Sequence, residues 1–288
     1  MKKKIQIIVG ILLFINLVIL GYHWFLINQP ISPDDLRVIF LNVGQGDAIL
    51  VQEKGKNILI DGGPSREIIH QLDQYLPFYQ RKIDLMICTH FDLDHVTGLT
   101  EVLKRMPVDR VIFSGRKSSL PASEKWLDLV EEKNIPNEIA FFPQEIKINE
   151  NLSLEFLWPE KEIIQKTDGS NNFTSLVFKL NYGEISFLFT GDATQEVEEH
   201  LLARGDDLKS DVLKVGHHGS KYSTLLEFVQ AVAPIYSVIS VGENNFNHPH
   251  LRVLKNLEQA GTKILRTDEK GEIIFLVTQG VLKPVPSF

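Results

Sequence analysis

Residues 89–98 read Thr-His-Phe-Asp-Leu-Asp-His-Val-Thr-Gly, and this stretch decides how the rest of the chain is interpreted. Its two histidines and two aspartates lie within six residues, from His90 to His95. The apolar run before it, residues 83–88, is typical of a buried strand, and after it apolar residues recur at helical intervals from Val96 to Met106. The sequence therefore places the cluster on a turn from a strand into a helix, where open α/β sheets bind ligands.

The residue types in this cluster indicate a metal site. Imidazole and carboxylate groups together are ligands for Zn²⁺, Mn²⁺ or iron. Aspartate and histidine also cap helices and occupy turns, and one such residue would be interpreted in that way. Four of them at alternate and adjacent positions favour a bound metal ion.

The first thirty residues differ in composition from the rest of the chain. Lys2, Lys3 and Lys4 precede an apolar run, residues 5–27, of about the length that spans a bilayer. The positive-inside rule then puts the lysines in the cytoplasm and everything downstream outside. We therefore expect residues 1–30 to form a single-pass membrane anchor and the start of a linker.

A cleaved signal peptide is the alternative for this segment, and it would make the protein secreted. Cleavage requires small residues, whereas residues 22–25 read Tyr-His-Trp-Phe. The bulky side chains favour the uncleaved anchor. Residues 31–288 are then expected to form one extracytoplasmic domain.

Charge and cysteine content restrict the functions of this domain. The chain carries a formal net charge of −7, and without Lys2–Lys4 the remainder carries −10. A broad basic face for duplex DNA is therefore not indicated. Cys88 is the single cysteine, which excludes a disulfide within the chain.

Strand-like and helix-like segments alternate through the domain. Strands are predicted at 36–43, 48–52, 57–60, 83–88, 111–113, 175–180, 184–190, 211–215, 235–241, 263–266 and 273–277, with two more within 146–158. Helices are predicted at 68–75, 96–106, 126–133, 195–202, 225–233 and 251–260. This order indicates an α/β protein with two sheets between layers of helices.

Three later strands also end in metal-type residues. The stretches are Thr190-Gly191-Asp192, Gly216-His217-His218-Gly219-Ser220 and Asn247-His248-Pro249-His250. Each is a weak signal by itself, because Asp192, for example, could merely cap the next helix. Their recurrence at the ends of successive strands indicates that they share one site with the first cluster.

Together these motifs resemble the metallo-β-lactamase superfamily, and more closely the extracellular β-lactamase-like domain of the ComEC family of competence proteins. The resemblance covers about residues 36–280 in six blocks, at 41–47, 61–63, 90–95, 190–192, 217–220 and 248–249. It implies a four-layer αββα sandwich with a metal centre at one edge. The sequence has one long hydrophobic segment rather than that family's multi-helix channel, so a separate channel protein would be a partner.

The resemblance also implies the ligands of one or two divalent ions. His90 and Asp92 would hold the first ion, Asp94 and His95 the second, and Asp192 would bridge them. Either His217 or His218 would complete the second site, with His217 favoured.

This chain departs from the superfamily pattern at the first metal site. Asp92 stands where a histidine is usual, and residues 171–175 contain no histidine where one usually precedes the bridging aspartate. The first site is therefore richer in oxygen, which admits Mn²⁺ beside Zn²⁺.

The predicted chemistry is hydrolysis by a metal-activated water. Asp94 would orient that water. His248, or whichever of His217 and His218 is not a ligand (His218 on the assignment above), would protonate the leaving group or stabilise an oxyanion. Asp47 and Asp61 are interpreted either as braces of the ligands or as plain turn residues.

We therefore expect a membrane-anchored, extracytoplasmic phosphodiesterase or nuclease of ComEC-like type. The acidic domain favours single-stranded DNA, a smaller substrate, or a cell-envelope phosphoester such as phosphocholine on teichoic acid. The alternative is a non-catalytic module that keeps the fold and binds DNA or a partner. The presence of all the cluster's ligands argues against that alternative, and the sequence leaves the oligomeric state open.

Overall fold

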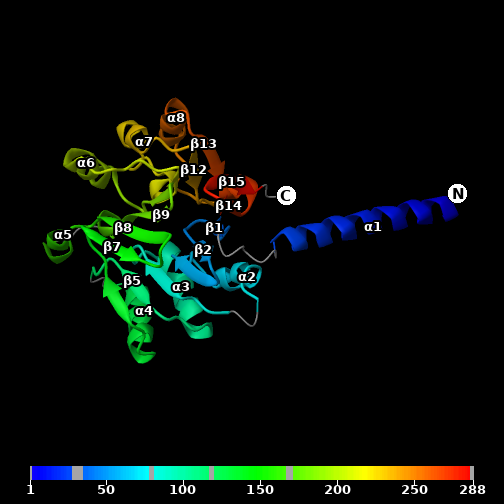
Figure 1. Cartoon of the computed structure of the whole chain (residues 1–288), viewed down its shortest axis with the longest axis horizontal. Coiled ribbons are helices and arrows are strands. Elements are labelled where there is room, and N and C mark those ends of the chain that lie inside the picture. The colour runs from blue at the N-terminus through cyan, green and yellow to red at the C-terminus, as the bar shows by residue number, and fades with distance from the viewer. Residues whose placement is uncertain (1, 28–34, 78–80, 117–119, 167–170, 286–288) are drawn as a thin grey trace.

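Two β-sheets lie face to face in the middle of the molecule, with helices on both outer surfaces (Figure 1). The computed structural model describes residues 2–27, 35–77, 81–116, 120–166 and 171–285. The first sheet has the order β15-β14-β1-β2-β3-β4-β5-β6, and the second has the order β13-β12-β11-β10-β9-β8-β7.

The strands of the first sheet are β1 (Asp35–Phe40), β2 (Ile49–Glu53), β3 (Lys56–Ile60), β4 (Leu85–Cys88), β5 (Val111–Phe113), β6 (Asn137–Ile139), β14 (Ile273–Thr278) and β15 (Val281–Val285). Those of the second are β7 (Gln144–Lys147), β8 (Leu152–Trp158), β9 (Val177–Tyr182), β10 (Ile185–Phe189), β11 (Val212–Lys214), β12 (Tyr236–Ile239) and β13 (Lys263–Arg266). The helices are α1 (Lys2–Ile27), α2 (Glu67–Asp73), α3 (Leu93–Arg105), α4 (Pro121–Glu132), α5 (Lys161–Lys166), α6 (Gln195–Arg204), α7 (Leu226–Val232), α8 (Leu251–Gln259) and α9 (Thr267–Lys270), with 3₁₀ turns η2 (Asn172–Thr174) and η3 (Gly216–Gly219).

Three apolar layers account for the sandwich. One lies between the sheets and includes Phe40, Phe178 and Phe275. A second joins the first sheet to α2, α3 and α4, and a third joins the second sheet to α6, α7 and α8. Strands covered on both faces are apolar throughout, as in β4 and β5. The predicted αββα arrangement is confirmed.

Parallel strands bring the site residues to one edge. β3, β4, β5 and β6 run parallel in the first sheet, and β10, β11, β12 and β13 run parallel in the second. The loops after β4, β10 and β11 therefore leave their sheets at carboxyl ends. A backbone hydrogen bond from Leu176 N, just before β9, to Thr89 O (3.0 Å), after β4, links the two sheets. Another, from His217 N to Gly191 O (3.1 Å), joins the loops after β11 and β10 within the second sheet.

The helix that carries the first cluster packs directly on the loop after β3. Gly98 N donates a hydrogen bond to Gly63 O (3.0 Å). A Cβ added at Gly98 would lie 1.8 Å from the carbonyl oxygen of Gly62, so only glycine permits this approach. The contact fixes the start of α3 against the first sheet.

Several boundaries differ from the predictions. The strand predicted over 36–43 ends at Phe40, because the following loop turns through Gly44 and Gly46, both at positive φ. The elements β6, β15, α5 and α9 were not predicted. They are short, and β6 and β15 are largely exposed, so their sequences give too few positions for a period to be recognised.

The N-terminal helix α1 extends away from the sandwich in Figure 1. Apolar side chains in its middle part, for example Leu13 and Leu17, are exposed. Residues 1 and 28–30 of the predicted anchor and linker lie outside the described residues, as do 31–34 at the start of the predicted domain. Within the part of the chain that the structure describes, no helix is long and apolar enough to cross a membrane. The membrane anchor remains a prediction.

Candidate metal centre

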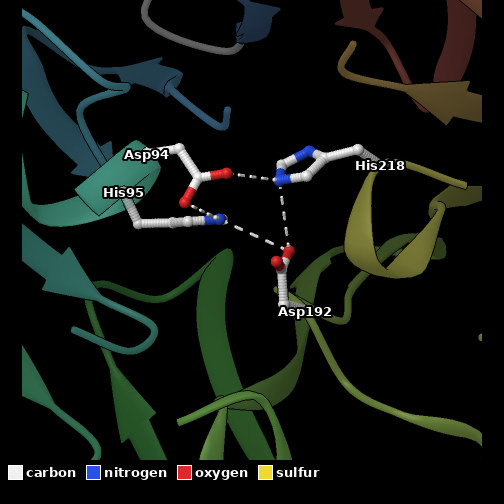
Figure 2. A group of neighbouring side chains, drawn as sticks. All are labelled: Asp94, His95, Asp192 and His218. Carbon is white, nitrogen blue, oxygen red and sulfur yellow. Dashed lines mark ion pairs between the residues drawn. The ribbon is translucent and has the colours of Figure 1, made fainter. Parts of the chain in front are cut away.

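Four side chains from three segments of the chain converge at the sheet edge (Figure 2). Asp94 and His95 lie in the first turn of α3, Asp192 follows β10, and His218 lies in η3 after β11. Their donor atoms are all within 4.8 Å of one another. The Nε2 atom of His218 lies 3.3 Å from Asp94 Oδ2, and that of His95 lies 3.4 Å from Asp192 Oδ1.

A second group surrounds the other oxygen of Asp192. Oδ2 lies 3.8 Å from His90 Nε2 and 3.7 Å from His217 Nε2. His90 Nε2 is in turn 3.7 Å from Asp92 Oδ2. The two oxygens of Asp192 thus face two different sets of ligands, which is the placement of a bridging carboxylate.

Three buried imidazoles are held so that one nitrogen of each faces the centre. The Nδ1 atom of His90 lies 3.0 Å from Thr89 Oγ1, that of His95 lies 2.9 Å from Asp61 Oδ2, and that of His218 lies 2.9 Å from Ser240 O. Their Nε2 atoms have no hydrogen-bond partner among the described residues. Buried unpaired nitrogens are rare, and a metal ligand oriented through its other nitrogen has this geometry. The residues present therefore fit one or two divalent ions.

Charges in this group shift one another's pKa values. Burial by itself would lower the pKa of His95. The negative charges of Asp192, Asp61 and Asp94 outweigh burial and raise that pKa well above its ordinary value. Burial by itself would raise the pKa of Asp192. The charges of His218 and His95 outweigh burial and hold that pKa well below its ordinary value. The carboxylate of Asp192 thus remains ionised, as a metal ligand must be.

Asp61 braces the centre. It accepts hydrogen bonds from the backbone nitrogen and the hydroxyl of Thr89, at 2.8 and 2.7 Å, as well as contacting His95. It is fully buried and adopts a positive φ beside Gly62. Of the two interpretations of Asp61, the brace is the one that its contacts support.

The sequence analysis missed Lys214, a buried lysine at the end of β11. Its Nζ atom forms an ion pair with Asp47, donates to Gly191 O (2.8 Å) and lies 3.9 Å from Asp192 Oδ1. A lysine inside the predicted strand 211–215 was the available signal. Asp47 also lies 3.6 Å from His218 Nδ1, so it braces the centre together with Lys214.

The adjacent histidines of η3 diverge. Both adopt left-handed backbone angles, with φ of 48° at His217 and 52° at His218. His218 is buried in the group with Asp94 and His95, whereas His217 is partly exposed beside Asp192 Oδ2. The preference for His217 as the residue completing the second site is therefore corrected, because the distances put His218 there.

The predicted proton donors are placed differently from expectation. His218 lies inside the ligand group, where its Nε2 atom faces Asp94 and Asp192. The His248 ring packs against the His217 ring, with centroids 5.6 Å apart. Burial and the neighbouring histidines lower the pKa of His248 to about 4, so its ring is neutral near pH 7. This state argues against His248 as a proton donor.

Comparisons with known proteins identify the family of this chain. Residues 41–243 match the family model described as the metallo-beta-lactamase superfamily. ComE operon protein 3 of Bacillus subtilis (strain 168) is 33% identical over 263 residues, which are 85% of this chain and 33% of that protein. Endoribonuclease YSH1 of Eremothecium gossypii is 28% identical over 184 residues, 58% of this chain and 24% of that protein.

A solved structure shares the fold. The metallo-beta-lactamase fold protein YhfI from Bacillus subtilis matches with a TM-score of 0.59 at 11% identity, covering 84% of this chain and 99% of that one. The predicted resemblance is confirmed. The chain spans about a third of the length of the first relative and about a quarter of the second.

Proposed function

The chain belongs to the metallo-β-lactamase superfamily, and on that premise we propose that it is a metal-dependent hydrolase that cleaves phosphodiester bonds of nucleic acid. The observation that carries the proposal is the division of Asp192 between two ligand groups. Paired divalent ions are a common device for phosphodiester cleavage. A relative named as an endoribonuclease supports the same substrate class.

We assign the ligands by their positions. Asp94, His95 and His218 would hold one ion with Oδ1 of Asp192. His90, Asp92 and His217 would hold the other ion with Oδ2 of Asp192. When bound, such ions activate a water molecule and stabilise the charge that develops on the phosphoryl group.

The remaining roles belong to the protein's own groups. Asp94 is the partly exposed carboxylate of its ligand group, so it can reach and orient an attacking water. Asp61, Thr89 and Lys214 keep the ligands in place through buried contacts. His248, neutral near pH 7, would accept or donate a hydrogen bond to the substrate rather than protonate the leaving group.

Cleavage of a labelled single-stranded oligonucleotide tests this proposal. We would purify the full chain in detergent, add Zn²⁺ or Mn²⁺, and compare the wild type with Asp94→Asn. The expected loss of rate is about 100-fold or more. Asp128→Asn is the matched control, because Asp128 is exposed on α4, away from the site. Equal rates for the wild type and Asp94→Asn would overturn the assignment.

We also propose that α1 attaches the domain to the outer face of a membrane. Three lysines precede its apolar run, and its side chains from Ile11 to Ile19 are largely apolar and exposed. Protease added to intact cells should then remove the domain while cytosolic markers survive. A domain that stays protected alongside those markers would contradict the outward orientation. A separate channel protein is the partner that this location would require for DNA uptake.

A further inference from the structure

A cavity of about 450 Å³ lies beside the metal centre. Its walls come from the segment after β11 and from the loop before α8. The lining side chains that matter here are His217, Lys221, Tyr222, Phe246, His248 and His250. His217 lines the cavity and also lies at the metal centre, since its Nε2 atom is 3.7 Å from Asp192 Oδ2. A group bound in the cavity would therefore be adjacent to a phosphoryl group at the metal centre.

Two exposed aromatic rings line this cavity. Tyr222 is 61% exposed and Phe246 is 69% exposed. Among the exposed large hydrophobic side chains of the described residues outside α1, only these two are aromatic. Exposed apolar rings gathered at a cavity mark a binding site, because burying them requires a ligand.

The loops that carry these rings are held in place by hydrogen bonds. The side chain of Asn244 accepts from Phe246 N and His248 N, each at 3.0 Å, and donates to Gly242 O and His248 O. The carbonyl of Tyr222 accepts a hydrogen bond from Gln195 N (2.8 Å) at the start of α6. The rings are therefore presented by ordered loops, which lowers the entropy lost on binding.

The charge of the lining selects among ligands. The cavity lining contains Lys221 and three histidines, and among the described residues no carboxylate lines the cavity. A quaternary ammonium group, which aromatic rings also bind, is disfavoured beside a lysine. A flat, neutral ring attached to an anionic backbone fits both the aromatic walls and the cation.

We propose that this cavity binds one unpaired nucleobase of a single-stranded nucleic acid whose phosphodiester lies at the metal centre. The proposal rests on the phosphodiesterase function proposed above. The base stacks on Tyr222 and Phe246, and Lys221 pairs with a neighbouring phosphate. A base within a duplex is already paired and stacked on both faces, so the site selects single strands.

Binding and cleavage of two oligonucleotides test the proposal. One is a short oligothymidylate, and the other has the same backbone with abasic residues in place of the bases. Binding to the full chain in detergent with Mn²⁺ is measured by fluorescence anisotropy, using phosphorothioate linkages that resist hydrolysis. Cleavage is measured with ordinary linkages. Variants are Tyr222→Ala, Phe246→Ala and Phe246→Trp, with Ile235→Ala as an exposed control outside the cavity.

We expect the wild type to bind the strand with bases about 5- to 100-fold more tightly than the abasic strand. Tyr222→Ala and Phe246→Ala should each remove most of that difference without weakening abasic binding, and Phe246→Trp should keep it. Equal affinity for the two strands, or alanine variants that behave like Ile235→Ala, would overturn the base-binding site even if both strands are cut. Tight, base-dependent binding with no cleavage under Zn²⁺ or Mn²⁺ would support the site and overturn the phosphodiesterase function.

Discussion

Lys214 illustrates how a single residue shapes the centre. It is buried among carboxylates, where it forms an ion pair with Asp47 and fixes the Gly191 carbonyl next to Asp192. Buried charges are costly unless they are paired and hydrogen-bonded, and Lys214 is both. Its contacts therefore hold in place the turn that carries Asp192.

Removing that charge should destabilise the protein. Lys214→Met leaves Asp47 buried without its cation, so we expect a loss of about 3–5 kcal/mol in the free energy of unfolding. Urea denaturation measures this loss, with Lys255→Met on the exposed face of α8 as the control. The double variant Asp47→Asn, Lys214→Met should recover part of the loss. A Lys214→Met protein as stable as the control would contradict this role.

Asp61 should influence metal affinity without touching the metal. Asp61→Asn retains the size of the side chain but weakens the contact that orients His95. Loss of such a brace typically lowers affinity about 10- to 100-fold. Competition titration with a Zn²⁺ indicator checks this value, and Asp128→Asn should match the wild type. Unchanged affinity in Asp61→Asn would make Asp61 a turn residue only.

The sequence predicted part of this site residue by residue. His90, Asp92, Asp94 and His95 were identifiable because they follow one another in a single turn. The roles of His217 and His218 were not, because adjacent residues in left-handed conformations point in directions that no sequence period describes. Lys214 was hidden within an apolar strand.

Elements position these residues through the carboxyl ends of parallel strands. β4 leads into α3, β10 into the Asp192 turn, and β11 into η3. The sequence predicted these strand ends well, since buried strands are apolar throughout. It predicted exposed edge elements such as β6 and β15 poorly, because they are short and largely exposed.

Glu198 joins two helices near the site. Its carboxylate, on α6, accepts hydrogen bonds from the backbone nitrogens of Thr224 and Leu225 at 2.6 and 2.7 Å, just before α7. Burial raises its pKa from 4.5 to about 8. The folded protein therefore keeps this proton up to a higher pH than the unfolded chain does.

The sign of the pH dependence follows from that difference. Between about pH 4.5 and pH 8 the unfolded chain has lost the proton that the folded protein retains, so stability falls as pH rises. Glu198→Gln cannot titrate. We expect the melting temperature of the wild type to fall relative to this variant, by about 2–4 °C for each kcal/mol lost. A difference that stays constant over that range would show that burial does not dominate at Glu198.

At the scale of the whole molecule, the centre joins the two halves of the sandwich. Asp94 and His95 come from the first sheet's side, and Asp192 and His218 from the second. The ligand set exists only when both sheets are assembled, so bound ions stabilise the folded state. The sandwich, and the edge of it that carries the site, could be predicted from the sequence because the motifs follow one another in order at the ends of strands. The packing of one half on the other depends on side chains far apart in the chain, which no local pattern specifies.

Metal content is the most direct test of the central claim. The full chain is loaded with Zn²⁺, freed of excess ion and analysed by mass spectrometry for bound metal, beside Asp192→Ala and Asp128→Asn. We predict one or two ions per chain in the wild type and in Asp128→Asn, with most of that metal lost in Asp192→Ala. A wild type that retains no more metal than Asp192→Ala would contradict the account.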